Sequence, residues 1–211
     1  MELKPYQQDV LDDLELYLEY IQEDHDYGKA FNRFWEDKIG AYNPVTRDGM
    51  RPYKNNVPGA VHACIKVPTA GGKTFIAVNG LRTIFNAFDT SKPKAVVWLV
   101  PWRNLLDQAY EALSDPDHPY RQKLNTLFNH RVGIYKKEDL LQGANFNPTV
   151  VEEQLSIFVM SFASLRARRR EDRKVFEENG QLASFADAFE TSDHVLEDTD
   201  ETALINVIRK L

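Results

Sequence analysis

The stretch that most constrains the fold of this chain is residues 67–74, which ends in Gly71, Gly72, Lys73 and Thr74. Before it, residues 61–67 alternate apolar and more polar side chains, which is the period of a strand. After it, apolar residues recur at helical spacing: Ala77, Leu81, Ile84, Phe85 and Phe88. A strand, a glycine-rich turn and a helix in this order predict a loop that faces the N-terminus of that helix.

Such a loop has the chemistry of a phosphate-binding site. Glycines at 71 and 72 let backbone N–H groups approach a polyphosphate, and the dipole of the following helix favours its negative charge. Lys73 would reach the β- and γ-phosphates, and the Thr74 hydroxyl would bind Mg²⁺. The predicted nucleotide-binding residues here are Thr69, Ala70, Gly71, Gly72, Lys73 and Thr74.

One position departs from the general phosphate-loop pattern. Val67 stands where that pattern has its first glycine, so the four residues Gly-Gly-Lys-Thr alone could also form an ordinary turn. The strand and helix expected on the two sides favour nucleotide binding over that alternative.

Composition and charge set the broad class. With 211 residues, 43% hydrophobic and 27% charged, the chain is long enough for a sizeable core. Its net charge of −6 gives no overall attraction to nucleic acid, so such binding would need a local patch. Cys64, the single cysteine, lies in the expected strand and is predicted to be a small core residue.

Location and metal binding follow from the same reading. No run approaches the roughly 18 apolar residues of a membrane helix, and no apolar signal segment opens the chain. We therefore expect a cytoplasmic protein without membrane contact. His, Cys, Asp and Glu nowhere show ligand spacing, so no metal site built by the protein alone is expected.

The remaining pattern predicts an α/β protein. A helix should occupy most of residues 1–25, followed by a short helix and a long irregular connection up to residue 61. Residues 95–100 form an uninterrupted apolar run, typical of a central parallel strand covered on both faces. A helix should follow over residues 105–113, which gives strand, helix, strand, helix with right-handed crossovers.

The second half of the chain adds strands at residues 131–135 and 155–160. Residues 166–179 are rich in arginine, which allows a nucleic-acid contact, although a solvated helix face is the alternative. Residues 181–201 are acidic and are expected to form an exposed connector, and residues 202–211 should form a short helix.

The order of these segments resembles the first motifs of superfamily 2 helicases. The matching segments are residues 3–7, 67–74, 97–101 with Leu105 and Gln108, and 158–165. Within that superfamily the chain is most similar to the restriction (Res) subunit of type III restriction-modification enzymes, which are DNA translocases with a nuclease. This narrower likeness rests on residues 99–102, on the spacing, and on residues 201–211.

The resemblance implies a fold and a domain layout. The fold would be an incomplete RecA-like P-loop NTPase domain, with a mainly parallel sheet and helices on both faces. Residues 1–60 would form the N-terminal helix and connection, residues 61–180 the P-loop core, and residues 181–211 the acidic connector and terminal helix.

The resemblance also implies ligands and contacts. ATP and Mg²⁺ would be the cofactors, and double-stranded DNA and a modification (methyltransferase) subunit the partners. Gln7 would read the adenine base with its side-chain amide, although this segment alone reads as a solvated first-turn residue. Contacts to the DNA backbone would come from Pro101, Trp102, Arg103, Gln108, Ser161 and Ser164.

Some parts of the family pattern are missing. The metal-binding carboxylates of the family lie at the end of an apolar strand, whereas no strand precedes Asp200 and Glu201, so we reject that pair as the carboxylate box. The second RecA-like domain with its arginine finger and the nuclease are also absent. We therefore expect nucleotide binding without efficient turnover.

The missing parts also bear on the sheet and on the choice between functions. In RecA-like sheets the strands beside the loop-bearing strand come later in sequence. We expect an incomplete sheet around residues 61–67, either because the chain is a shortened piece or because a second copy covers the edge.

Two functions remain open: an ATPase motor fragment of a DNA-restriction enzyme, and a non-catalytic nucleotide-binding module. A small-molecule kinase fits poorly, because Gln7 and residues 99–102 have no role in one.

Overall fold

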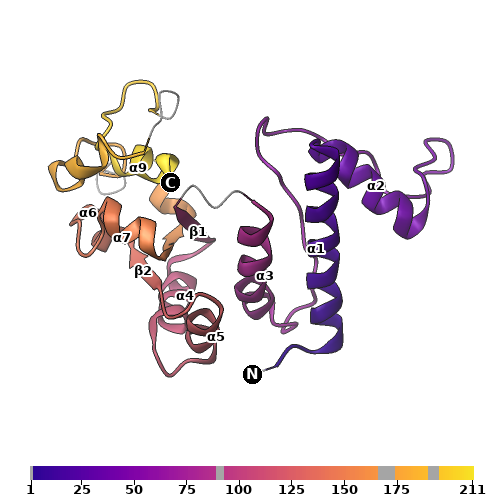
Figure 1. The fold of residues 1–211 in the computed structure, drawn as a ribbon, viewed down its shortest axis with the longest axis horizontal. Helices are drawn as coiled ribbons and strands as arrows, with labels where there is room; N and C mark the ends of the chain where they lie inside the picture. Colours follow the sequence, from indigo (N-terminus) through magenta and orange to yellow (C-terminus); the bar gives the residue numbers. More distant parts are fainter. Residues whose placement is uncertain (1, 89–92, 166–173, 190–194) are drawn as a thin grey trace. The chain divides into compact units, whose positions relative to one another are not determined.

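The computed structural model describes residues 2–88, 93–165, 174–189 and 195–211, and the chain divides into two compact units, Met1–Asp89 and Thr90–Leu211 (Figure 1). Much of the basic stretch at residues 166–179 therefore lies outside the described residues. Its described end, residues 174–179, forms a turn and irregular chain, with no helix.

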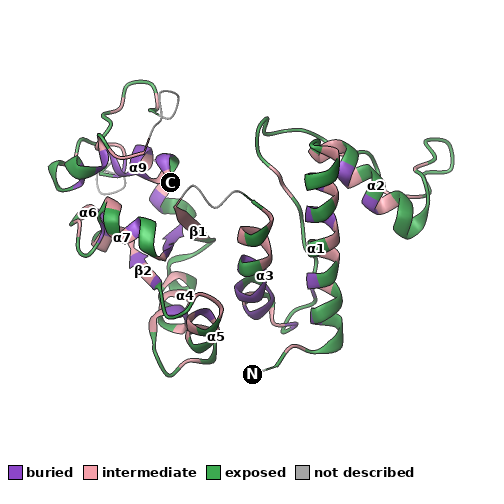
Figure 2. Ribbon diagram, viewed as in Figure 1, coloured by how far each residue is buried: buried purple, intermediate pink, exposed green. Residues whose placement is uncertain are grey.

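The first unit is helical. Its helices α1 and α2 pack through an apolar cluster that includes Tyr17, Leu18, Ile21, Ala30 and Phe34, and α1 also packs along α3. Figure 2 shows buried and exposed positions interleaved along α1 and α2, as an amphipathic pattern predicts. The described helices of this unit are α1 (Pro5–Asp24), α2 (Tyr27–Ile39) and α3 (Lys73–Ala87).

Local chemistry sets the ends of these helices. Pro5 opens α1, where a missing N–H is no loss. His25 ends α1 in a left-handed conformation with φ of +51°. Asp26 then caps α2, because its carboxylate accepts a hydrogen bond of 2.9 Å from the Lys29 N–H. The predicted N-terminal helix and the short helix after it are thus confirmed.

The strand predicted for residues 61–67 is wrong. Residues 40–72 form neither helix nor strand, and the described part of the first unit contains no strand to pair with them. An alternating pattern is not sufficient, because a strand is held by the ladder of hydrogen bonds to its neighbours. Cys64, in this segment, is exposed and not a core residue. Val67 is buried and packs with Leu11 and Ile76, and Val61 is partly buried against the cluster of α1 and α2.

The second unit contains a sheet of three parallel strands in the order β1-β3-β2. Strands β1 and β2 are joined by two helices. Of the predicted order strand, helix, strand, helix over residues 61–113, the last three elements are confirmed and the first strand is not. The described elements are β1 (Lys94–Val100), α4 (Arg103–Ser114), α5 (Pro119–Leu127), β2 (Val132–Lys136), α6 (Lys137–Leu141), α7 (Pro148–Glu153), β3 (Leu155–Ser161), the 3₁₀ helices η1 (Phe162–Leu165) and η2 (Gly180–Phe185), and α9 (Leu204–Lys210).

The central strand of this sheet is β3 and not, as predicted, β1. Every residue of β3 is buried, whereas Val97 and Leu99 on β1 are each 38% exposed. Both strands are largely apolar and of the same length, so the sequence of each strand alone could not show which of the two is central. Their order is set by pairing: Phe158 of β3 lies between Val97 of β1 and Tyr135 of β2.

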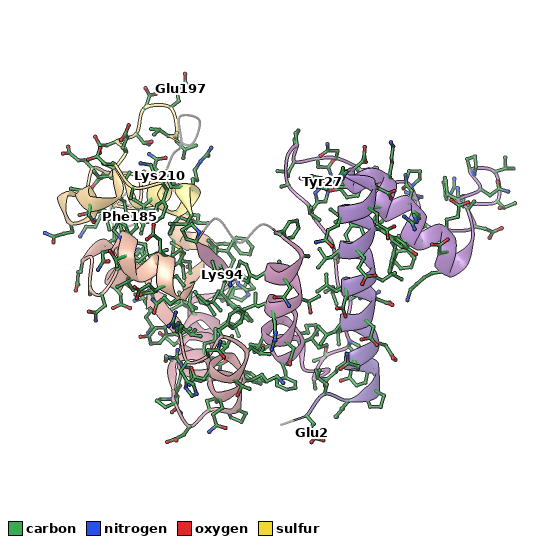
Figure 3. All side chains as sticks on the ribbon, in the orientation of Figure 1. Glu2, Tyr27, Lys94, Phe185, Glu197 and Lys210 are labelled. Carbon is green, nitrogen blue, oxygen red and sulfur yellow. The ribbon has the colours of Figure 1, made fainter. Side chains whose placement is uncertain are left out.

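Aromatic rings fill the core beside β3. Phe146 lies 5.5 Å from Phe158 and 4.8 Å from Phe185, measured between ring centroids. Phe185 and Leu182 belong to η2 and are fully buried, so the prediction that residues 181–201 form an exposed connector is wrong for its first part. The many acidic residues of 181–201 drew attention away from a short apolar segment, η2, whose Leu182 and Phe185 pack in the core. The terminal helix α9 packs on it, and Lys210 lies beside Phe185 (Figure 3).

Candidate nucleotide-binding site

The glycine-rich loop leads directly into α3. Gly72 is the residue before the helix, with φ of +72°, and its carbonyl accepts a 3.0 Å hydrogen bond from the Ile76 N–H. Ala70 is also left-handed, with φ of +62°. Gly72 has no side chain, so it gives no cap hydrogen bond to the first turn of α3, and the N-terminus of a helix favours an anion.

Val67 explains why the loop needs glycine at 71. A Cβ atom placed on Gly71 would lie 2.5 Å from Val67 Cγ1 and 2.9 Å from the Pro68 oxygen. The valine side chain therefore fills the space beneath the loop, and the Gly71 N–H donates to the Pro68 oxygen at 3.0 Å. Val67 is thus part of the floor of the loop.

The N-terminus of α1 holds the same loop from the other side. Gln7 is 3% exposed, and its Nε2 donates a 3.1 Å hydrogen bond to the Gly71 oxygen. Its Oε1 accepts from the Lys4 N–H at 2.9 Å, which fixes the orientation of the amide. A Cβ on Gly72 would lie 2.5 Å from Gln7 Nε2, so the glutamine occupies the space that this glycine leaves. The structure therefore brings together Gln7 and the loop, 64 residues apart in sequence.

Tyr6 is a residue of this site that sequence reasoning missed. Its hydroxyl donates a 2.9 Å hydrogen bond to the same Gly71 oxygen. Tyr6 stood in the segment 3–7 that carried the resemblance, but periodicity gives no signal for a contact with a residue so far along the chain.

The remaining predicted loop residues are exposed or half-buried. Lys73 is exposed, and its Nζ donates a 2.9 Å hydrogen bond to the Pro68 oxygen. Thr69 and Ala70 are exposed, and Thr74 is half-buried in the first turn of α3. A triphosphate with Mg²⁺ fits this donor set, because the positions without Cβ, the uncapped helix and the ammonium group all favour an anion.

A groove elsewhere in the first unit is a poorer candidate for nucleotide binding. A groove of about 330 Å³ between α1 and α3 is lined by Glu15, Glu19, Gln22 and Arg82, among others. It lies at the C-terminal end of α3, away from Lys73, and acidic side chains on its wall disfavour an anion.

The residues expected to contact DNA all lie in the second unit. Val100 and Ser161 are partners in the β1–β3 register, so the segments after both strands begin at the same edge of the sheet. Trp102, directly after β1, is 69% exposed, and Arg103 is exposed beside it.

The other members of that set differ in exposure. Pro101 and Gln108 are exposed. Ser161 and Ser164 are buried, and their hydroxyl oxygens lie 3.1 Å apart in a hydrogen bond to each other. The structure thus brings the two serines together and leaves Pro101, Trp102, Arg103 and Gln108 accessible.

The carboxylates near the end of the chain form a turn. Asp200 Oδ1 accepts hydrogen bonds from the hydroxyl and the N–H of Thr202, at 2.6 and 2.8 Å, and these bonds hold the pKa of Asp200 below its usual range. Residues 195–199, directly before Asp200 and Glu201, form no strand. The rejection of this pair as a carboxylate box stays a prediction. Among the described residues, no group of three or more His, Cys, Asp or Glu side chains could hold a metal ion.

No helix in the described ranges is both long and apolar enough to cross a bilayer.

Comparison with known proteins shows which family the chain belongs to. Neither a curated protein nor a solved structure matches the chain. The family model described as "Type III restriction enzyme, res subunit" matches residues 1–190. A match over this share of the 211 residues shows that the chain belongs to the family of type III restriction enzyme Res subunits.

Proposed function

We propose that this chain is the ATP- and Mg²⁺-binding N-terminal part of a DNA-dependent translocase subunit of a type III restriction enzyme. The family has a RecA-like fold, and its helicase-like domains generally use ATP with Mg²⁺. The observation that carries the proposal is the glycine loop at residues 71–72, which enters α3 with no side-chain cap on the helix.

The residues of the loop have distinct roles in this proposal. Lys73 exchanges the Pro68 oxygen for the β- and γ-phosphates, and the Thr74 hydroxyl takes one Mg²⁺ coordination site. Gln7 keeps its Nε2 bond to Gly71. Since a glutamine amide carries a second N–H and a second lone pair on oxygen, it retains the means to pair with adenine.

DNA binding completes the proposed activity. Trp102 and Arg103, exposed at the C-terminal edge of the sheet, would contact the DNA backbone, which positions a duplex without reading its sequence. In the whole enzyme, ATP use would drive translocation and cleavage of double-stranded DNA together with the modification subunit. We place the protein in the cytoplasm, where these partners meet.

We expect residues 1–211 to hydrolyse ATP poorly. Phosphoryl transfer needs carboxylates that hold the metal and orient water, and Asp200 and Glu201 do not form such a pair. A phosphate-release assay with ATP, Mg²⁺ and DNA should therefore show little hydrolysis, at ATP concentrations at which calorimetry shows binding. Turnover that Lys73→Ala abolishes would contradict this part of the proposal.

The preference for ATP over GTP tests the proposed recognition of adenine by Gln7. Calorimetric titration should show that ATP binds more tightly than GTP, because Gln7 would pair with adenine. Equal affinities would argue against base reading by Gln7. ATP binding that DNA does not influence would favour the alternative, a non-catalytic nucleotide-binding module.

A further inference from the structure

Two consecutive side chains of α1 hold one carbonyl group of the loop. The Tyr6 hydroxyl and Gln7 Nε2 both donate to the Gly71 oxygen, at 2.9 and 3.1 Å. A carbonyl oxygen has two lone pairs, so these two donors satisfy its acceptor capacity. The family resemblance assigns base reading to Gln7 and gives Tyr6 no role.

The geometry of a peptide unit turns this contact into control of the loop. In a planar trans peptide the C=O and the next N–H point in opposite directions. When the Gly71 oxygen is held towards α1, the Gly72 N–H must point away from α1. That N–H is one of the loop donors that a polyphosphate would use.

The peptide unit between Gly71 and Gly72 turns over easily unless other groups restrain it. It lies between two glycines, which lack the Cβ atoms that restrict backbone rotation at other residues. If it turned over, the partial negative charge of the Gly71 oxygen would replace the Gly72 N–H opposite the phosphates. Tyr6 and Gln7 together oppose that rotation.

We propose that Tyr6 is a positioning residue for polyphosphate binding, which acts through the Gly71 oxygen to aim the Gly72 N–H at the phosphates. The inference rests on the proposed nucleotide-binding function. It predicts an effect on the affinity for the phosphate chain and none on recognition of the base.

The variant Tyr6→Phe tests this directly, because it removes the hydroxyl and keeps the ring. The probes are Mg²⁺ with ATP and Mg²⁺ with inorganic tripolyphosphate, titrated calorimetrically into the full chain. Loss of one hydrogen bond to the loop should weaken both ligands by the same factor, roughly fivefold.

Tyr20→Phe is the matched control. Tyr20 lies on the same helix, and its hydroxyl donates a 2.8 Å hydrogen bond to Asp37, not to the loop. This variant should bind both ligands like the unaltered chain, and thermal unfolding should show both variants folded.

Each other outcome has a definite meaning. Unchanged tripolyphosphate affinity in Tyr6→Phe overturns the inference and leaves the proposed function standing. A loss for ATP alone indicates contact with the nucleoside, and an equal loss in Tyr20→Phe indicates a general effect on the helix; both overturn it. If the unaltered chain binds neither ligand, the proposed function itself fails.

Discussion

Lys73 Nζ donates a hydrogen bond of 2.9 Å to the main-chain oxygen of Pro68, five residues earlier. The same oxygen accepts from the Gly71 N–H at 3.0 Å, so one carbonyl holds both the turn of the loop and its ammonium group. An ammonium bound to a neutral carbonyl gains a stronger partner when a phosphate oxygen replaces it. The loop is therefore arranged to exchange an internal contact for a ligand contact.

The variant Lys73→Ala should lose ATP affinity by tenfold or more, as expected for a charge-assisted hydrogen bond of about 1.5–3 kcal/mol. Its free energy of unfolding should hardly change, because the side chain is exposed. Calorimetry with ATP and Mg²⁺ measures the first effect and urea unfolding the second. Lys66→Ala, which removes an exposed cation just before the loop, is the control and should bind ATP normally. An equal loss in both variants would show only a general charge effect.

A second prediction separates two reasons for glycine at position 72, its left-handed backbone and its contact with Gln7. Gly72→Ala places a Cβ in the left-handed region, at φ of +72°, and 2.5 Å from Gln7 Nε2. Gly59 has a similar φ of +80°, and a Cβ on that residue would meet no atom within 4 Å, so Gly59→Ala reports the backbone strain alone.

Both variants should be destabilised in urea unfolding. Gly72→Ala should lose roughly 1 kcal/mol more than Gly59→Ala, because Gln7 must move and give up its bond to Gly71. Equal losses would mean that Gln7 adapts freely and does not support the loop.

The helices of this chain could largely be predicted from sequence, because their signals are local. The apolar positions of α1 and α3 recur at helical spacing, and Pro5 marks the start of α1. The glycine-rich turn before α3 was predicted for the same reason. The loop residues of the candidate site were thus chosen from a short stretch and the helix after it, and their role in binding stays a prediction.

The features that sequence could not supply all depend on distant partners. Residues 61–67 alternate like a strand, but no described strand of their unit pairs with them. The apolar run of β1 looks central, yet its place at the sheet edge is decided by the pairing of β3 with β2. The contact between Tyr6 and Gly71 joins positions 65 residues apart. Periodicity within a short window contains none of this information.

A third prediction concerns Lys210, which is buried in the second unit. Its Nζ donates to the oxygens of Phe185 and Ala186, at 3.0 and 2.7 Å, and so satisfies carbonyl groups at the end of η2. Lys210→Met keeps most of the apolar stem and removes both donors. It should reduce the free energy of unfolding by about 1–3 kcal/mol, because the buried Phe185 carbonyl and the part-buried Ala186 carbonyl lose their partner.

Arg209 offers the matched control for this prediction. It precedes Lys210 on α9 and is exposed, so Arg209→Met should change stability by no more than about 0.5 kcal/mol. Urea unfolding followed by circular dichroism compares the two variants. If they lose the same stability, the contacts of Lys210 with η2 contribute nothing beyond its charge.

The last prediction is a pH dependence that arises at Tyr17. Burial raises the pKa of Tyr17 to about 12, with a smaller contribution from Tyr53, and its hydroxyl lies 3.4 Å from the Tyr27 oxygen. In the unfolded chain a tyrosine titrates near pH 10. Between about pH 10 and 12 the unfolded state therefore releases a proton that the folded state keeps, so the stability present below pH 10 is lost as the pH rises through this window. Tyr17→Phe removes that contribution, and the difference in unfolding free energy between the unaltered chain and the variant should decrease from about pH 9.5 upward. Urea unfolding at a series of alkaline pH values measures this difference, and a constant difference across the window would show that Tyr17 titrates alike in both states.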